Sequence, residues 1–139
     1  MLLALLVIAA TSATVKFPEG LLDLPPGCEA PREVPMVIDA YIGFIECRAP
    51  QLRIVLSGGA ASSPACGTQP RPGSRVTLRS NAGLPFVVCT RARPTDRPTG
   101  PITMVIALAG GSLEADIATP RDALFLLQLA ASWRLPAKQ

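Results

Sequence analysis

Four widely spaced cysteines constrain the fold of this chain more than any other feature of its sequence. They are Cys28, Cys47, Cys66 and Cys89, and no two form the C-x-x-C pair of zinc sites and thioredoxin-like motifs. An even number of distant cysteines is typical of disulfides in proteins that leave the reducing cytoplasm. Three pairings are possible. We expect Cys28–Cys47 and Cys66–Cys89, because each ties an irregular segment to a strand near it in sequence; four free thiols in a cytosolic protein are the alternative.

The N-terminal residues favour export independently of the cysteines. Residues 2–10 are an unbroken apolar run, which suits a signal peptide and is far shorter than the roughly 20 residues of a membrane-spanning helix. Thr11 and Ala13 fit the small-residue positions of a cleavage site. We therefore expect residues 1–13 to be a signal peptide and the mature protein to be periplasmic or secreted, without a membrane span. No Lys or Arg precedes the run, so the signal is minimal or begins upstream; a buried N-terminal strand or helix is the alternative.

Composition limits the core and the chemistry. A chain of 139 residues is one domain in length, and with 4% aromatic residues its core must be aliphatic. Fifteen prolines and eleven glycines favour turns and long connections over a helical bundle. The sequence contains no histidine, which excludes Ser-His-Asp and Cys-His catalysis and His-containing zinc sites. No motif nominates a catalytic residue, a metal ligand or a cofactor.

The mature chain divides at about residue 35. Residues 14–35 are punctuated by proline and are predicted to form an extended or irregular N-terminal arm. Residues 36–139 are predicted to form one domain. Within it, the stretch 34–47 is rich in β-branched and aromatic residues and too long for one strand, so we expect a bulge or bend at Gly43. Further strands are predicted at residues 52–57, 75–79 and 84–90, with Leu52, Ile54, Leu56, Val76 and Leu78 facing inward.

A hairpin and a helix complete the predicted domain. Residues 102–109 and 112–118 flank Gly110-Gly111, a connection that accepts positive φ, and the apolar first strand is expected to lie centrally in the sheet. Thr119 as N-cap, Pro120 and Asp122 predict a helix that Pro136 ends, with Trp133 as a core anchor. The predicted fold class is α+β: an antiparallel sheet of about five to six strands with one C-terminal helix packed across it.

A pattern across the chain resembles a known group. Residues 37–46 (VIDAYIGFIE) contain I-D-x-x-x-G-x-I, a second strand follows from 52–54, and it ends in the glycine pair Gly58-Gly59, followed by Ala60. With the later hairpin and C-terminal helix, this pattern resembles a loose group of small exported bacterial proteins of unknown function. The group carries no named activity, so the resemblance implies export and this fold and says nothing about chemistry.

Four carboxylates are candidates for chemistry. Glu114 and Asp116 are separated by one residue on a predicted strand and so share a face, while Asp39 and Glu46 flank the first strand region. Paired carboxylates serve in acid–base catalysis or calcium binding. The alternation of Glu114 and Asp116 with apolar residues favours a solvated face instead. If Asp39 is buried it needs a partner, for which we expect Arg53 or a backbone donor.

Arginines are concentrated in one part of the chain and suggest a binding surface. The stretch with Asp96 as its only acid contains Arg71, Arg75, Arg79, Arg91, Arg93 and Arg97. Such a surface would attract an unknown protein or an anionic envelope component, whereas nucleic acid is disfavoured because no aromatic residues are interleaved for base stacking. A solvated loop region is the alternative. Leu124 and Phe125 lie off the inward helix face, and an exposed apolar pair there would suit a protein partner.

We therefore expect a non-enzymatic, disulfide-stabilised module that binds a partner in the bacterial envelope or outside the cell. The expected binding surface combines the loop 91–101 with the arginines of residues 71–79. Two alternatives remain open. One is a secreted enzyme or metal-binding protein that uses Asp39, Glu46, Glu114 and Asp116. The other is an inhibitor of a secreted hydrolase that presents a disulfide-braced loop near Cys66.

Overall fold

The computed structural model describes residues 13–17, 20–29, 31–34, 40–59, 75–90 and 101–137. The predicted signal peptide lies outside these residues except for Ala13, the first residue of β1. The described elements are β1 (Ala13–Phe17), β2 (Gly20–Leu24), β3 (Arg32–Val34), β4 (Ala40–Arg48), β5 (Gln51–Gly59), β6 (Arg75–Arg79), β7 (Pro85–Thr90), β8 (Ile102–Leu108), β9 (Gly111–Ile117) and α1 (Pro120–Ala131).

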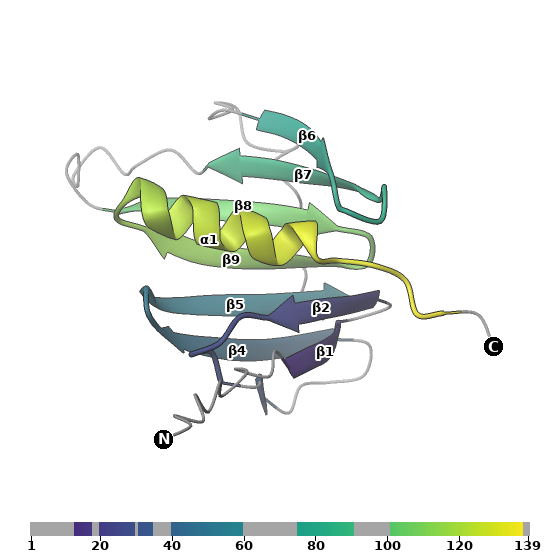
Figure 1. Cartoon of the computed structure of the whole chain (residues 1–139), viewed down its shortest axis with the longest axis horizontal. Helices are drawn as coiled ribbons and strands as arrows, with labels where there is room; N and C mark the ends of the chain where they lie inside the picture. The colour runs from purple at the N-terminus through teal and green to yellow at the C-terminus, as the bar shows by residue number, and fades with distance from the viewer. Residues whose placement is uncertain are drawn as a thin grey trace, which may run out of the picture.

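One antiparallel sheet organises the described residues. Its seven strands lie in the order β3-β4-β5-β9-β8-β7-β6, and β1 and β2 form a separate antiparallel pair. Figure 1 shows α1 lying across β8 and β9, and the β1–β2 pair lying over β4 and β5. The predicted α+β class, the antiparallel sheet and the C-terminal helix are confirmed. The described sheet has one strand more than the expected range, and the short edge strand β3 accounts for it.

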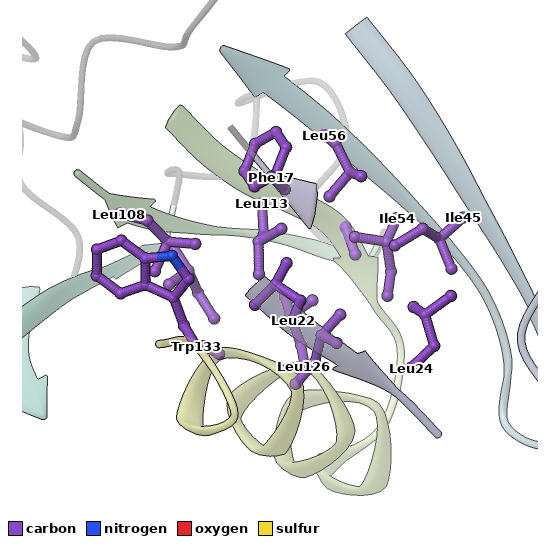
Figure 2. Close-up of a cluster of buried hydrophobic side chains, with 14 of the residues drawn as sticks. Phe17, Leu22, Leu24, Ile45, Ile54, Leu56, Leu108, Leu113, Leu126 and Trp133 are labelled. Carbon is purple, nitrogen blue, oxygen red and sulfur yellow. The ribbon is translucent and has the colours of Figure 1, made fainter. Parts of the chain in front are cut away.

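The core contains residues from the segment that was predicted to be an extended or irregular arm outside the domain. Phe17 of β1 and Leu22 and Leu24 of β2 are completely or almost completely buried, in one cluster with the sheet and α1. Figure 2 shows Leu22 and Leu24 between Leu126 of α1 and the sheet. These residues are therefore extended, as one of the two readings expects, but they pack in the core and do not form a separate arm. The prolines do not break β2, because Pro25 and Pro26 follow the strand and leave its alternation of buried and half-buried residues intact.

Strand β4 is regular where a bend was expected. Its ladder with β5 runs unbroken from Ala40 opposite Gly59 to Arg48 opposite Gln51, and Gly43 pairs with Leu56 inside it. The unbroken register leaves no bulge at Gly43, so the expected interruption of the strand at this residue is wrong. Of the stretch 34–47, Val34 belongs to β3 and residues 40–47 belong to β4.

The predicted hairpin is confirmed, with its turn displaced by one residue. Leu108 pairs with Gly111, so the connection consists of Ala109 and Gly110, and Gly110 has φ 81°. Gly111 belongs to β9, where an added Cβ would lie 2.7 Å from the carbonyl oxygen of Ser57. The two glycines therefore serve different purposes: Gly110 permits the turn, and Gly111 permits close packing of backbone. The predicted central position of β8 is confirmed, since it lies between β9 and β7.

The helix begins as predicted and ends earlier. The Thr119 Oγ1 accepts a hydrogen bond from the Asp122 amide at 3.3 Å, and Asp122 Oδ2 accepts one from the Thr119 amide at 3.2 Å, which completes a capping box. The last helical residue is Ala131, ahead of the expected stop at Pro136. Leu126, Leu129 and Ala130 are buried, and Trp133 just beyond the helix is 2% exposed, so its predicted role as a core anchor is confirmed.

We expect the Thr119→Ala variant to unfold with a free energy lower by about 1 kcal/mol, because the Asp122 amide loses its capping acceptor. Urea denaturation followed by circular dichroism measures this difference. Thr119→Ser is the matched control, since it retains the hydroxyl. Its free energy of unfolding should lie within about 0.5 kcal/mol of that of the wild type. Equal losses in both variants would contradict a capping role for the hydroxyl.

Candidate interaction surface

A disulfide between Cys28 and Cys47 fastens the chain after β2 to the end of β4. The two Cα atoms lie 4.0 Å apart, and backbone bonds flank the link: the Arg48 amide donates to Gly27 at 3.0 Å and the Glu29 amide to Glu46 at 2.8 Å. The predicted Cys28–Cys47 pairing is confirmed. Cys89 is also disulfide-bonded, and its expected partner Cys66 lies outside the described residues.

We expect the Cys28→Ser/Cys47→Ser double variant to lose about 3 kcal/mol of unfolding free energy, because the bond closes a loop with a sequence separation of 19 residues. Urea denaturation of the oxidised wild type and of the variant measures the loss. An intact Cys89 bond in both proteins, checked by mass after alkylation, ensures that only one cross-link differs. A loss below about 1 kcal/mol would contradict a stabilising role.

Three of the four candidate carboxylates lie on the sheet face that points away from α1. Glu46 of β4 pairs with Arg53 of β5 at 2.8 Å, and the Arg53 guanidinium lies 4.5 Å from the centre of the Phe44 ring. Asp116 of β9 accepts a hydrogen bond from the Thr103 hydroxyl at 2.8 Å. Asp39 lies outside the described residues, so the expected Asp39–Arg53 pair is untested there, and Arg53 takes Glu46 as its partner.

A pocket of about 320 Å³ lies where β5 and β9 diverge, lined by Gln51, Leu52, Arg53, Val55, Glu114, Ala115 and Asp116. The ladder between these strands begins at Val55 opposite Glu114, although β5 starts four residues earlier, at Gln51. Two acids and an arginine therefore meet in one place. Within the described ranges, however, no group of three or more His, Cys, Asp or Glu side chains has a geometry that could hold a metal ion.

The arginine cluster is described only in part. Arg75 and Arg79 both belong to β6, and both are exposed. Arg79 donates a hydrogen bond to the carbonyl oxygen of Gly83 at 3.0 Å. The other four members, Arg71, Arg91, Arg93 and Arg97, lie outside the described residues, so the six-arginine surface stays a prediction.

Strand β6 is an edge strand with all five side chains exposed. It ends the order of the sheet, and no described strand pairs with its outer side. Val76 is 50% exposed and Leu78 is 39% exposed, so the burial expected of these two inward-facing residues is wrong. They lie opposite Val88 and Phe86 of β7, which are core residues, so they do point to the α1 side of the sheet. Their position at the edge leaves them uncovered.

The backbone of β6 has a defined orientation toward its open side. The Ser80 amide donates to the Leu84 carbonyl at 2.8 Å, in the same register that pairs Leu78 with Phe86 and Val76 with Val88. In an antiparallel ladder, hydrogen-bonded residue pairs alternate with pairs that are not hydrogen-bonded to each other. Ser80, Leu78 and Val76 are therefore the residues that bond to β7, and the residues between them are not. The N–H and C=O groups of Arg75, Thr77 and Arg79 therefore point to the open edge. Pro85, which has no N–H, lies opposite Arg79 in agreement with this alternation.

The expected apolar pair on the helix is exposed only in part. Leu124 is 56% exposed, whereas Phe125 is half-buried and packs against the core.

No described helix is long and apolar enough to cross a membrane. Comparisons with models of protein families, with curated proteins and with solved structures return no match for this chain. The chemistry of its described surfaces is therefore the basis for a functional assignment.

Proposed function

We propose that this protein is a non-enzymatic binding module that works outside the cytoplasm, in the bacterial envelope or beyond the cell, and that a partner docks on the open edge of β6. The observation that carries the proposal is the exposure of all five β6 side chains beside outward-pointing backbone groups. An open strand edge is a template for pairing with another chain, and natural proteins normally cover or blunt it. A binding function explains why this edge carries exposed Val76 and Leu78.

The cross-links support the extracytoplasmic part of the proposal. Cys28–Cys47 is bonded, Cys89 is bonded as well, and disulfides persist in oxidising compartments. The predicted signal peptide adds to this support from the sequence.

The arrangement of the acids favours binding over acid–base chemistry. Glu46 is paired with Arg53, and Asp116 accepts a hydrogen bond from Thr103. General acids and bases in enzymes are usually tuned by burial or by closely placed like charges. Glu46 is 47% exposed as a side chain and Asp116 is exposed, so neither has the desolvated setting that such tuning requires.

Site-specific photo-crosslinking tests the docking surface. The benzophenone amino acid is placed at position 76 in one variant and at position 135 in another, because Val76 and Leu135 are both large, apolar and about half exposed. Both variants are produced in the native host and irradiated in intact cells. We expect a discrete adduct of higher mass from position 76 and none from position 135. Adducts of equal yield from both positions, or none from position 76, would refute docking on β6.

The compartment is tested separately on the same cells. Free thiols are alkylated before lysis, and the masses of the chain from the cytoplasmic and extracytoplasmic fractions are compared. We expect the extracytoplasmic fraction to contain the chain with Cys28 and Cys47 protected from alkylation. A chain found wholly in the cytoplasm would contradict the proposed location.

A further inference from the structure

The outer edge of β6 offers a complete set of contacts for one additional strand. Arg75, Thr77 and Arg79 direct backbone donors and acceptors outward, as the register with β7 requires. Their side chains lie on the sheet face away from α1, and Val76 and Leu78 lie on the α1 face. An incoming extended segment would gain backbone hydrogen bonds, an apolar contact on one face and a charged contact on the other.

The charge of this edge selects the chemistry of the segment. Residues 75–90, which form β6, the following turn and β7, include two arginines and no carboxylate. The side chains of Arg75 and Arg79 leave β6 on the same face, with Thr77 between them, and the Arg79 guanidinium also donates a hydrogen bond to the Gly83 carbonyl at 3.0 Å. Opposite charges on neighbouring strands stabilise pairing and like charges oppose it. The edge therefore favours a strand with acidic residues on the face that meets Arg75 and Arg79.

The same arginines disfavour a second copy of this chain as the occupant. An antiparallel pairing of two β6 strands over all five residues would place Arg75 of each copy opposite Arg79 of the other. Two such like-charged pairs oppose self-association along this edge.

We propose that β6 binds an extended acidic segment of another protein, which joins the seven-stranded sheet as an additional edge strand. This inference rests on the proposed function and specifies its partner. The segment carries two acidic residues separated by three positions, which match Arg75 and Arg79 along β6. Apolar residues at the alternate positions between them contact Val76 and Leu78.

The test uses the oxidised chain and a blocked synthetic peptide, Ser-Glu-Val-Thr-Val-Glu-Ser, with a matched peptide in which both Glu are replaced by Lys. Titration calorimetry measures affinity, and hydrogen exchange locates protection. We expect the Glu peptide to bind about tenfold or more tightly than the Lys peptide, because two attractive charge pairs with Arg75 and Arg79 become two repulsive pairs. Protection should fall on the amides of residues 75, 77 and 79.

Two variants separate the contributions of charge and backbone. Arg75→Glu/Arg79→Glu should reverse the preference between the two peptides, because the edge becomes acidic. Thr77→Pro should abolish binding of the Glu peptide, since it removes an outward amide without taking a donor from the β6–β7 ladder. Thr77→Val is its control and should retain binding. Denaturation curves for each variant show whether the chain still folds.

The outcomes divide cleanly. Selective binding that the charge reversal inverts and Thr77→Pro abolishes would support the acidic-strand proposal. No binding of the Glu peptide, equal binding of both peptides, or a chain that is dimeric through β6 would overturn it. A crosslink from position 76 in cells together with no peptide binding would leave docking on β6 standing while refuting the acidic strand. Failure of both experiments would refute the docking surface itself.

Discussion

The Phe17→Ala variant is expected to unfold with a free energy about 3–5 kcal/mol lower than that of the wild type. Phe17 is completely buried, and its ring lies against the backbone of Gly111, where an added Cβ would be only 2.8 Å from the ring. The substitution therefore opens a cavity between β1 and β9 that the rigid strand backbone cannot fill. Urea denaturation of the oxidised protein, followed by the fluorescence of Trp133, measures the loss.

Lys16→Ala is the control for this prediction. Lys16 neighbours Phe17 in β1 but is exposed, so its removal should change the unfolding free energy by less than about 0.5 kcal/mol. The comparison also tests whether the N-terminal strands belong to the cooperative core. A loss of less than about 1 kcal/mol in Phe17→Ala would show that they fold separately from the sheet.

Replacing Trp133 by alanine is expected to cost about 3–5 kcal/mol as well. Trp133 is the only tryptophan of the chain, is 2% exposed and closes the core beyond the end of α1 (Figure 2). Its surroundings are tight, because a Cβ on Gly20 would overlap the indole Nε1. Since the variant lacks the fluorescent probe, circular dichroism during urea denaturation provides the measurement.

Trp133→Phe separates packing from the polar atom of the indole. Among the described residues, the indole Nε1 is buried and has no hydrogen-bond partner, and an unsatisfied buried donor costs about 1–3 kcal/mol. Phenylalanine removes that cost while leaving a smaller cavity than alanine, so the two effects nearly cancel. We expect Trp133→Phe to stay within about 1 kcal/mol of the wild type. A loss as large as that of Trp133→Ala would show that the indole nitrogen makes a stabilising interaction.

The two stability predictions concern the layer that covers the sheet, which consists of α1 and of the β1–β2 pair. The sequence indicated the helix more clearly than the two strands. The helix was predictable to its capping residues because a cap depends on neighbours within four positions: Thr119, Pro120 and Asp122 are sufficient. The strands β1 and β2 were obscured by the prolines around them. Their inclusion in the core depends on contacts across the fold, including the backbone bonds between Leu21 and Arg134 at 2.7 Å and 3.1 Å.

The candidate surface was also predicted in part. The concentration of arginines indicated a surface that includes Arg75 and Arg79, and the structure places both on one exposed strand. The alternation of Val76 and Leu78 correctly indicated one face of that strand, but it could not indicate whether another layer covers the face. That depends on the position of the strand in the sheet, and α1 lies over β8 and β9 (Figure 1).

The amino-acid sequence by itself determined the α+β class, the late hairpin and the capped helix, and it favoured Cys47 among the possible partners of Cys28, because each depends on local patterns or on proximity along the chain. Only the tertiary structure decided that the proline-rich segment supplies core strands, that Gly111 must lack a side chain, and that β6 lies at an open edge. Those properties arise from pairing and packing between residues that are distant in sequence. The periodicity within a strand contains no information about such contacts.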